Sequence, residues 1–226
     1  MNYRETRNYL NLEKRIYETA NPYGFPELRP CNLELDSAQM LGFNYAKTEK
    51  HPEDKIVHFF LDDYQFERVW NNPNHYISLL SRFKAVVMPD FSTYSDFPMI
   101  IQQYNHYRNL WLARYWQDYG VEVIPQSYFA ADGSIDWAYI GMPKYSLLCI
   151  STVGGILRKE AKANFPTGLK RTLDILQPRE ILLYGKMYPI LEEAIKESSF
   201  TGKITVGRPQ NFADLEAKSM RGKETA

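Results

Sequence analysis

Residues 84–125, KAVVMPDFSTYSDFPMIIQQYNHYRNLWLARYWQDYGVEVIP, carry the pattern that decides the fold class. Two short apolar segments, 84–88 and 121–125, enclose a stretch over 98–118 in which large side chains recur every three or four positions, and Gly120 follows it. The apolar segments predict buried strands, and the stretch between them predicts a helix that stops at the glycine. A strand, a helix and a strand at this spacing indicate a crossover between parallel strands.

Four more segments have the same apolar character. They are KIVHFFL (55–61), SLLCIS (146–151), EILLY (180–184) and KITV (203–206). All six segments are nearly continuous in hydrophobicity, which is typical of strands that are covered on both faces. We therefore expect an α/β protein with a single domain and a mostly parallel sheet of about six strands. A Rossmann-like open sheet and an incomplete β/α barrel both fit, because a complete barrel requires eight strands.

The two ends of the chain differ from its middle. Residues 20–30, ANPYGFPELRP, contain three prolines in eleven positions and predict an ordered loop rather than a strand. We expect residues 1–54 to form an N-terminal arm packed on the domain, residues 55–210 to form the α/β domain, and residues 211–226 to form a tail that begins as a helix and frays.

Composition and charge indicate which partners and which cellular compartment to expect for the protein. The 27 basic residues balance the 27 acidic ones, so no overall field attracts nucleic acid or an anionic membrane, although a local patch could. Cys31 and Cys149 are far apart, and the apolar surroundings of Cys149 favour a buried free thiol over a disulfide. No apolar segment reaches the roughly 18 residues of a membrane span, and the first residues do not form a secretory signal. We expect a cytoplasmic protein without membrane contact.

Polar residues follow five successive predicted strands. Because the carboxyl ends of parallel strands meet at one edge, where ligands bind, we expect a ligand site there. The candidate catalytic residues, which follow strand 84–88, are Asp90, Ser92 and Tyr94. The candidate ligand-binding residues at the other strand ends are Asp62, Asp63, Gln126, Ser151, Thr152, Gly154, Gly155, Tyr184 and Lys186. The alternative for each residue taken alone is a turn or a helix cap, since Asp, Ser, Thr and Gly serve both roles.

The segment ISTVGGILRKE (150–160) could hold a phosphate. Its two glycines would let the backbone approach an anion, and the helix that follows would offer unpaired amides. Lys186 could add a positive charge to the same anion. The segment lacks the spacing of a Walker loop and of GxGxxG, so a plain strand-to-helix turn is the alternative.

Two further groups of side chains are candidates for ligand contacts. Asn105 and Arg108 are three residues apart on the predicted helix, and aromatic residues flank them. They could stack a base or clamp a phosphate, or the arginine could simply extend to water from a core helix. Asp62, Asp63 and Asp90 could hold Mg²⁺ beside a phosphate, whereas the histidines and cysteines show no zinc spacing. The cofactor is otherwise unknown.

Four segments, in order and spacing, resemble a family of uncharacterised proteins, a domain of unknown function found in bacteria and carried by their phages, plasmids and integrative elements. They are MPDFSTYSDFP (88–98), QQYNHYRNLWLARYWQDYGVEVIP (102–125), GMPKYSLLCISTVGG (141–155) and ILLYG (181–185). Within them stand the motifs PDFSxYxDxP, NxYRN…YWQxxGxxVIP and ISTVG. The resemblance covers about residues 25–190, and no motif is a known catalytic signature. It implies a role in replication or transfer of nucleic acid, in nucleotide modification, or in countering host defence.

These observations favour a phage or mobile-element protein that binds a nucleotide-like or phosphorylated small ligand at the carboxyl edge of the sheet and could act on it as an enzyme. One alternative is a nucleic-acid-binding accessory protein for replication or transfer of a mobile element. It would use the basic helix residues Arg108, Arg114, Lys159, Lys162, Lys170 and Arg171. The other alternative is a protein that counters host defence by binding a host protein through an aromatic-rich surface.

Overall fold

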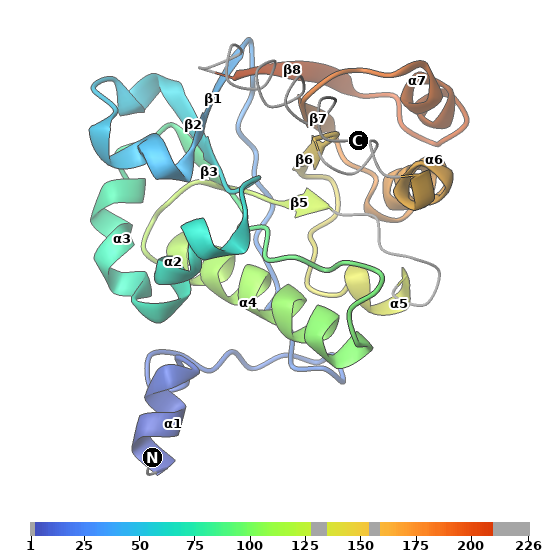
Figure 1. Ribbon diagram of the computed structural model, residues 1–226. Helices are drawn as coiled ribbons and strands as arrows, with labels where there is room; N and C mark the ends of the chain where they lie inside the picture. The colour runs from blue at the N-terminus through green and yellow to red at the C-terminus, as the bar shows by residue number, and fades with distance from the viewer. Residues whose placement is uncertain (1–2, 128–134, 154–158, 210–226) are drawn as a thin grey trace, which may run out of the picture.

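A computed structural model of the chain describes residues 3–127, 135–153 and 159–209 (Figure 1). Their centre is an eight-stranded sheet in which every strand runs parallel to its neighbours, in the order β4-β3-β2-β1-β8-β7-β6-β5. The strands are β1 (Ala38–Gly42), β2 (Lys55–His58), β3 (Ala85–Val87), β4 (Val123–Ile124), β5 (Gln126–Ser127), β6 (Leu147–Ser151), β7 (Glu180–Tyr184) and β8 (Lys203–Pro209).

The two edge strands of this sheet are neighbours in the chain. Only Pro125 separates β4 from β5; β4 pairs with β3, and β5 pairs with β6. The proline has no N–H to give to a ladder, which accounts for the break, but its carbonyl accepts the N–H of Cys149 at 2.8 Å. The sheet therefore closes into a barrel where β4 is followed by β5. With β4 and β5 sharing one position, the eight strands make a barrel of seven positions, one fewer than a (β/α)₈ barrel.

The α/β class, the single domain and the parallel sheet are confirmed. Five of the six expected strand segments contain β2, β3, β4, β6 and β7, and the sixth, 203–206, is the first part of β8, which continues to Pro209. Of the two arrangements expected, the incomplete barrel describes the sheet more closely. The expected arm over 1–54 needs a correction, because β1 lies inside it and pairs with β2 on one side and β8 on the other. Its sequence AQMLG has no β-branched or aromatic residue, so it does not stand out as a strand.

Helices cover the outside of the barrel. Figure 1 shows α2 and α3 on one side of the sheet, α6 and α7 on the opposite side, and α4 running below the strands. The α-helices are α1 (Tyr3–Tyr9), α2 (Glu67–Asn71), α3 (Pro73–Leu80), α4 (Met99–Asp118), α5 (Ile135–Ala138), α6 (Lys159–Leu176) and α7 (Pro189–Lys196), and the 3₁₀ helices are η1 (Phe43–Thr48), η2 (Pro52–Asp54) and η3 (Asp63–Gln65). The helix expected over 98–118 is confirmed by α4. Among the described helices, none combines the length and the apolar character needed to cross a membrane.

Successive strand residues face different apolar clusters. Ile56 on β2 and Leu182 on β7 belong to the cluster inside the barrel, whereas their neighbours Val57 and Leu183 belong to clusters under the helices. This alternation explains why the strands read as continuous apolar segments, since both faces are buried. Fully burying one such aliphatic side chain contributes about 1.5–3 kcal/mol.

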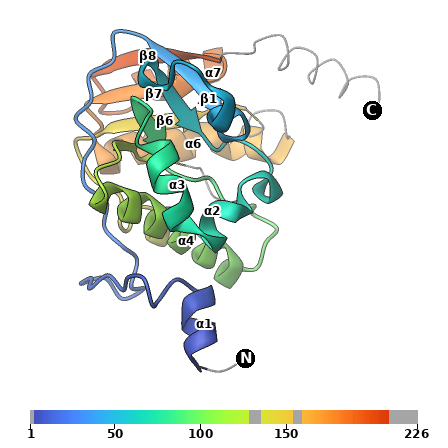
Figure 2. The same ribbon diagram turned by 90° about the vertical axis from the view of Figure 1, so that its left-hand side faces the viewer.

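The segment before β1 is partly built into the fold. Helix α1 projects away from the barrel in both views (Figures 1 and 2). Just after it, the buried Asn11 donates its side-chain N–H to the carbonyl of Trp70 at 2.8 Å. Further along, the N–H of Cys31 donates to Ser146 Oγ, and the N–H of Leu147 donates to the carbonyl of Cys31. Both cysteines are buried and free, as expected.

Candidate functional site

Four polar side chains stand at the carboxyl end of the barrel interior. Their strands alternate between inward and outward residues, and the inward series leads to His58 on β2, Gln126 on β5, Ser151 on β6 and Tyr184 on β7. His58, Gln126 and Tyr184 are buried, and Ser151 is partly buried. Because all the strands are parallel, these four positions lie at the same end of the barrel, which is where barrel enzymes place their active sites.

Three rings contact one another across this end. The rings of His58 and Tyr184 are 4.3 Å apart between centroids, and the ring of Phe60 lies 5.1 Å from Tyr184 and 5.4 Å from His58. Strands β2 and β7 are separated by β1 and β8 in the sheet order, so the contact between His58 and Tyr184 crosses the interior. The aromatic rings thus form one wall of the candidate site.

Asp90 joins the site from the loop after β3. Gln126 Nε2 donates a hydrogen bond to Asp90 Oδ1 at 2.8 Å. Burial raises the pKa of Asp90 to about 7, the bond from Gln126 works in the opposite direction, and the charge of Asp63 adds to the rise. Burial likewise raises the pKa of Cys149, and the charge of Asp90 raises it further. Asp90 is therefore a carboxyl group that changes its protonation state near neutral pH.

His58 is a neutral imidazole in this setting. Burial lowers its pKa to about 3. Its Nδ1 accepts the backbone N–H of Phe60 at 3.3 Å, which assigns the proton of the neutral ring to Nε2. Within the part of the chain that the structure describes, neither Nε2 of His58 nor the hydroxyl of Tyr184 has a hydrogen-bond partner. Both groups are therefore donors that a polar ligand could meet.

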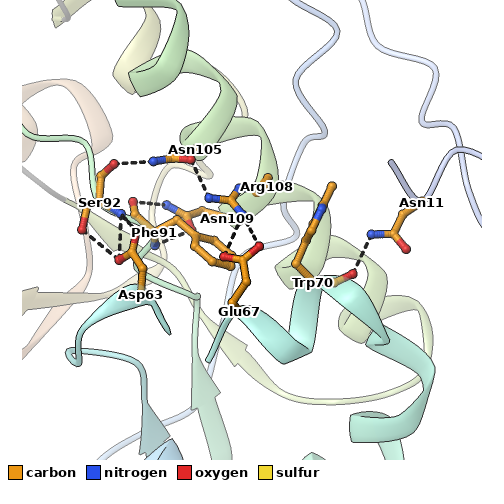
Figure 3. A network of polar contacts seen from close by, with 9 residues as sticks. All are labelled: Asn11, Asp63, Glu67, Trp70, Phe91, Ser92, Asn105, Arg108 and Asn109. Atoms are coloured by element: carbon orange, nitrogen blue, oxygen red, sulfur yellow. Dashed lines mark hydrogen bonds and ion pairs between the residues drawn. The ribbon is translucent and has the colours of Figure 1, made fainter. Parts of the chain in front are cut away.

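Ser92 is used to hold the loop after β3. Its hydroxyl donates to Asp63 Oδ1 at 2.8 Å, its N–H donates to Asp63 Oδ2 at 3.1 Å, and its carbonyl accepts from Asn105 (Figure 3). The side chain of Asn109 bonds both the N–H and the carbonyl of Phe91. Helix α4 begins without a side-chain cap, so the capping alternative for this loop does not apply. These bonds fix the backbone on the carboxyl side of Asp90.

Asn105 and Arg108 belong to the same network. Arg108 donates to both carboxylate oxygens of Glu67, at 2.8 and 3.0 Å, and to Asn105 Oδ1 at 2.7 Å (Figure 3). Its guanidinium lies 3.8 Å from the centre of the Phe91 ring. The structure thus brings Arg108 onto an aromatic ring, as its sequence setting suggested, but the ring and the anion are both supplied by the protein.

The other predicted residues are more dispersed. Asp62 is exposed at the start of η3, and Tyr94 is 45% exposed and packs edge-to-face on Phe97. Lys186 is exposed, and Thr152 is buried and accepts the backbone N–H of Lys186 at 3.0 Å.

The two glycines of the expected phosphate cradle, Gly154 and Gly155, lie outside the described residues. A Cβ at Gly185, whose φ is +111°, would collide with the Thr152 hydroxyl, so the turns after β6 and β7 pack directly on each other. This places Lys186 beside the start of the predicted cradle.

The magnesium hypothesis gains no support from the carboxylates. Across residues 3–127, 135–153 and 159–209, no three His, Cys, Asp or Glu side chains are grouped closely enough to hold a metal ion. Asp63 is instead occupied by Ser92, and Asp62 is bonded by Gln65 Nε2 at 3.4 Å.

Three residues of the site were not among the predicted ones. His58, Phe60 and Cys149 lie inside apolar segments, where they were counted as core. A usable signal was the histidine in KIVHFFL, because a polar residue at the inward position that ends a buried strand faces the carboxyl end of the barrel. Phe60 and Cys149 carry no such signal, since apolar residues are ordinary in a strand.

Comparisons with known proteins show the family of this chain. The family described as Domain of unknown function (DUF4417) matches residues 17–200. Two proteins named Gene 1 protein, from Mycobacterium phage D29 and Mycobacterium phage L5, are each 33% identical to the chain over 180 residues. The match covers 79% of this chain, 66% of the D29 protein and 77% of the L5 protein. No solved structure matches the chain. The expected resemblance to a family of phage and mobile-element proteins is therefore confirmed, and the chain belongs to the family Domain of unknown function (DUF4417).

Proposed function

We propose that this protein binds a small nucleotide-like ligand at the carboxyl end of its barrel, with Asp90 as the group that exchanges a proton. The observation that carries the proposal is that two pairs lie at the same end of the barrel: Gln126 bonded to Asp90, and the buried His58 against Tyr184, whose donors have no partner in the described part of the chain. In parallel α/β proteins this end of the sheet is where ligands bind.

A nucleotide-like ligand fits both kinds of group in the site. The rings of His58, Phe60 and Tyr184 offer an aromatic wall on which a flat base can lie. The polar atoms of Asp90 and Gln126 can bond the edge of such a base. A phosphate would extend toward Lys186, the exposed cation that follows β7.

Asp90 is the best candidate for acid–base chemistry in the site. A group whose pKa lies near the working pH can both accept and give a proton, which is what general acid–base catalysis needs. Ser92 keeps a supporting role, because its hydroxyl and backbone are bonded to Asp63 and Asn105. The neutral His58 could donate a hydrogen bond to an oxygen of the ligand that gains negative charge.

The nucleic-acid alternative has less support. Arg108 is buried against Glu67 and Phe91, Arg114 donates to the carbonyl of Glu27, and Lys170 pairs with Asp174, so at least three of its six basic residues are used within the protein. Overall charge is balanced. Duplex binding that weakened steeply between roughly 50 and 200 mM salt would favour this alternative over the small ligand.

Thermal shift with a panel of nucleotides and dinucleotides, with and without Mg²⁺, tests the proposal. At about 100 times its dissociation constant a ligand adds about 2.7 kcal/mol, which should raise the melting temperature by about 5–10 °C. Tyr184→Phe removes one hydroxyl from the site and should weaken the response. Tyr64→Phe removes one from a tyrosine that is 79% exposed and should not. Silence of the wild type across the whole panel, or equal responses from both variants, would overturn the proposal.

A further inference from the structure

The pair formed by Asp90 and Gln126 presents two acceptor atoms. The amide nitrogen of Gln126 donates to Asp90 Oδ1. The amide oxygen Oε1 of Gln126 and the second carboxylate oxygen Oδ2 of Asp90 remain as acceptors. Neither oxygen has a partner among the residues that the structure describes. While Asp90 is ionised, a ligand that meets this pair must bring hydrogen-bond donors, because an acceptor placed there would face two oxygens.

Two other groups at this end of the barrel, on strands β2 and β7, are donors. His58 carries its proton on Nε2, since Nδ1 accepts from Phe60, and the hydroxyl of Tyr184 lies beside it across the interior. Burial raises the pKa of Tyr184 to about 12, so its hydroxyl keeps its proton at neutral pH. The site therefore matches a ligand that has hydrogen-bond donors on one edge, for Asp90 and Gln126, and an acceptor on another, for His58 and Tyr184.

We infer that the base recognised at this site is a 2-amino-6-oxopurine, a guanine-type base, rather than adenine. Its ring N–H and 2-amino group are adjacent donors that match Asp90 Oδ2 and Gln126 Oε1, and its 6-oxo group and N7 are acceptors that match His58 and Tyr184. Adenine would place an unprotonated ring nitrogen against the carboxylate. The inference rests on the proposed nucleotide-like ligand and deepens it.

Binding of such a base is coupled to the proton of Asp90. The groups that face Asp90 are Asp63 from η3, Gln126 from β5 and Cys149 from β6. A base that donates to the carboxylate favours its ionised form, and with a pKa near 7 that form is about ten times more populated at pH 8 than at pH 6. Guanine nucleotides should therefore bind about tenfold more tightly at pH 8 than at pH 6.

Calorimetric titration with GMP, IMP and AMP at pH 6 and pH 8 tests the inference. We expect GMP to bind at least tenfold more tightly than AMP, and IMP, which lacks the 2-amino group, to fall between them; one hydrogen bond to a charged group has about this effect. Asp90→Asn turns the free oxygen into a donor, so it should remove both the preference for GMP and the pH dependence. Asp96→Asn changes an exposed acid of the same loop and should alter neither.

The outcomes separate the two proposals. If AMP binds wild type as tightly as GMP, and Tyr184→Phe weakens it, the site takes nucleotides but the guanine assignment is wrong. If no nucleotide binds at either pH, the proposed function itself is wrong. If Asp90→Asn is too unstable to assay, Gln126→Leu gives a second test, because it removes the amide oxygen that accepts from the 2-amino group. It should lower the affinity for GMP at pH 8 to that for IMP, and an unchanged preference for GMP over IMP would overturn the inference.

Discussion

Asp90 works against the stability of the fold at neutral pH. Its pKa is about 7 in the folded protein, above the ordinary value of 3.8, so the folded state holds the proton more tightly than the unfolded chain does. The stability that this proton gives is fully present below pH 4 and is lost as the pH rises toward 7. A carboxyl group whose pKa is strongly raised by burial is typical of functional sites, where residues needed for binding or catalysis lower the stability of the fold.

Replacing Asp90 with asparagine should stabilise the protein at high pH. The amide cannot ionise, so the cost of a desolvated carboxylate disappears, and we expect the variant to gain about 1–3 kcal/mol at pH 8 and almost nothing at pH 4. Thermal melts from pH 4 to pH 8 measure the difference. Buried histidines affect both proteins alike and cancel. A variant that loses stability at every pH would identify Asp90 as a structural hydrogen-bonding residue.

At the scale of the elements, one network joins two loops to helix α4. Asp63 and Glu67 come from the segment after β2, Ser92 from the loop after β3, and Asn105 and Arg108 from the helix (Figure 3). Because the loop after β3 also carries Asp90, the network sets the position of that carboxyl group.

Loss of Arg108 should therefore destabilise the protein. Arg108→Ala removes the bonds to Glu67 and Asn105 and the contact with Phe91, and we expect a loss of about 2–4 kcal/mol, less than for a fully buried pair because Glu67 is 40% exposed. Lys170→Ala, which breaks an exposed pair with Asp174 on α6, should cost under about 0.5 kcal/mol.

Urea unfolding measures both variants. Adding Glu67→Ala to Arg108→Ala should cost little more, since the pair is already broken. If Arg108→Ala unfolds like the wild type, the guanidinium is not structural, and its predicted role in ligand binding becomes the better explanation.

Local patterns predicted the elements but not their partners. Helix α4 follows from its three- and four-residue spacing, and the strands β2, β3, β4, β6, β7 and β8 follow from short apolar segments. The spacing of Asn105 and Arg108 showed that they share a helix face, but the pairing of Arg108 with Glu67 spans 41 positions and depends on the packed fold. Asp90 and Gln126 were found because they end strands, whereas His58 was hidden by its apolar neighbours.

At the scale of the whole molecule, closure depends on the two ends of the chain. Strand β1 lies near the N-terminus and pairs with β8, the last strand described. A Cβ at Gly207 on β8 would collide with Met40 on β1, so the closing strands fit closely inside the barrel. The expected boundary at residue 54 missed this, because pairing between distant segments leaves no trace in a local pattern.

Truncation tests whether residues 1–54 are an arm packed on the domain or contain a strand, β1, that the barrel needs. A chain that starts at residue 10 loses only the projecting helix α1 and keeps Asn11 on the carbonyl of Trp70, so it should melt cooperatively within a few degrees of the full chain. A chain that starts at residue 55 loses β1, which leaves β2 and β8 with unpaired edges and exposes the barrel interior around Ile56. We expect this shorter chain to lack a cooperative melt and a near-ultraviolet circular dichroism signal. If it folds as stably as the full chain, residues 1–54 are an arm after all, and the barrel does not need β1 to close.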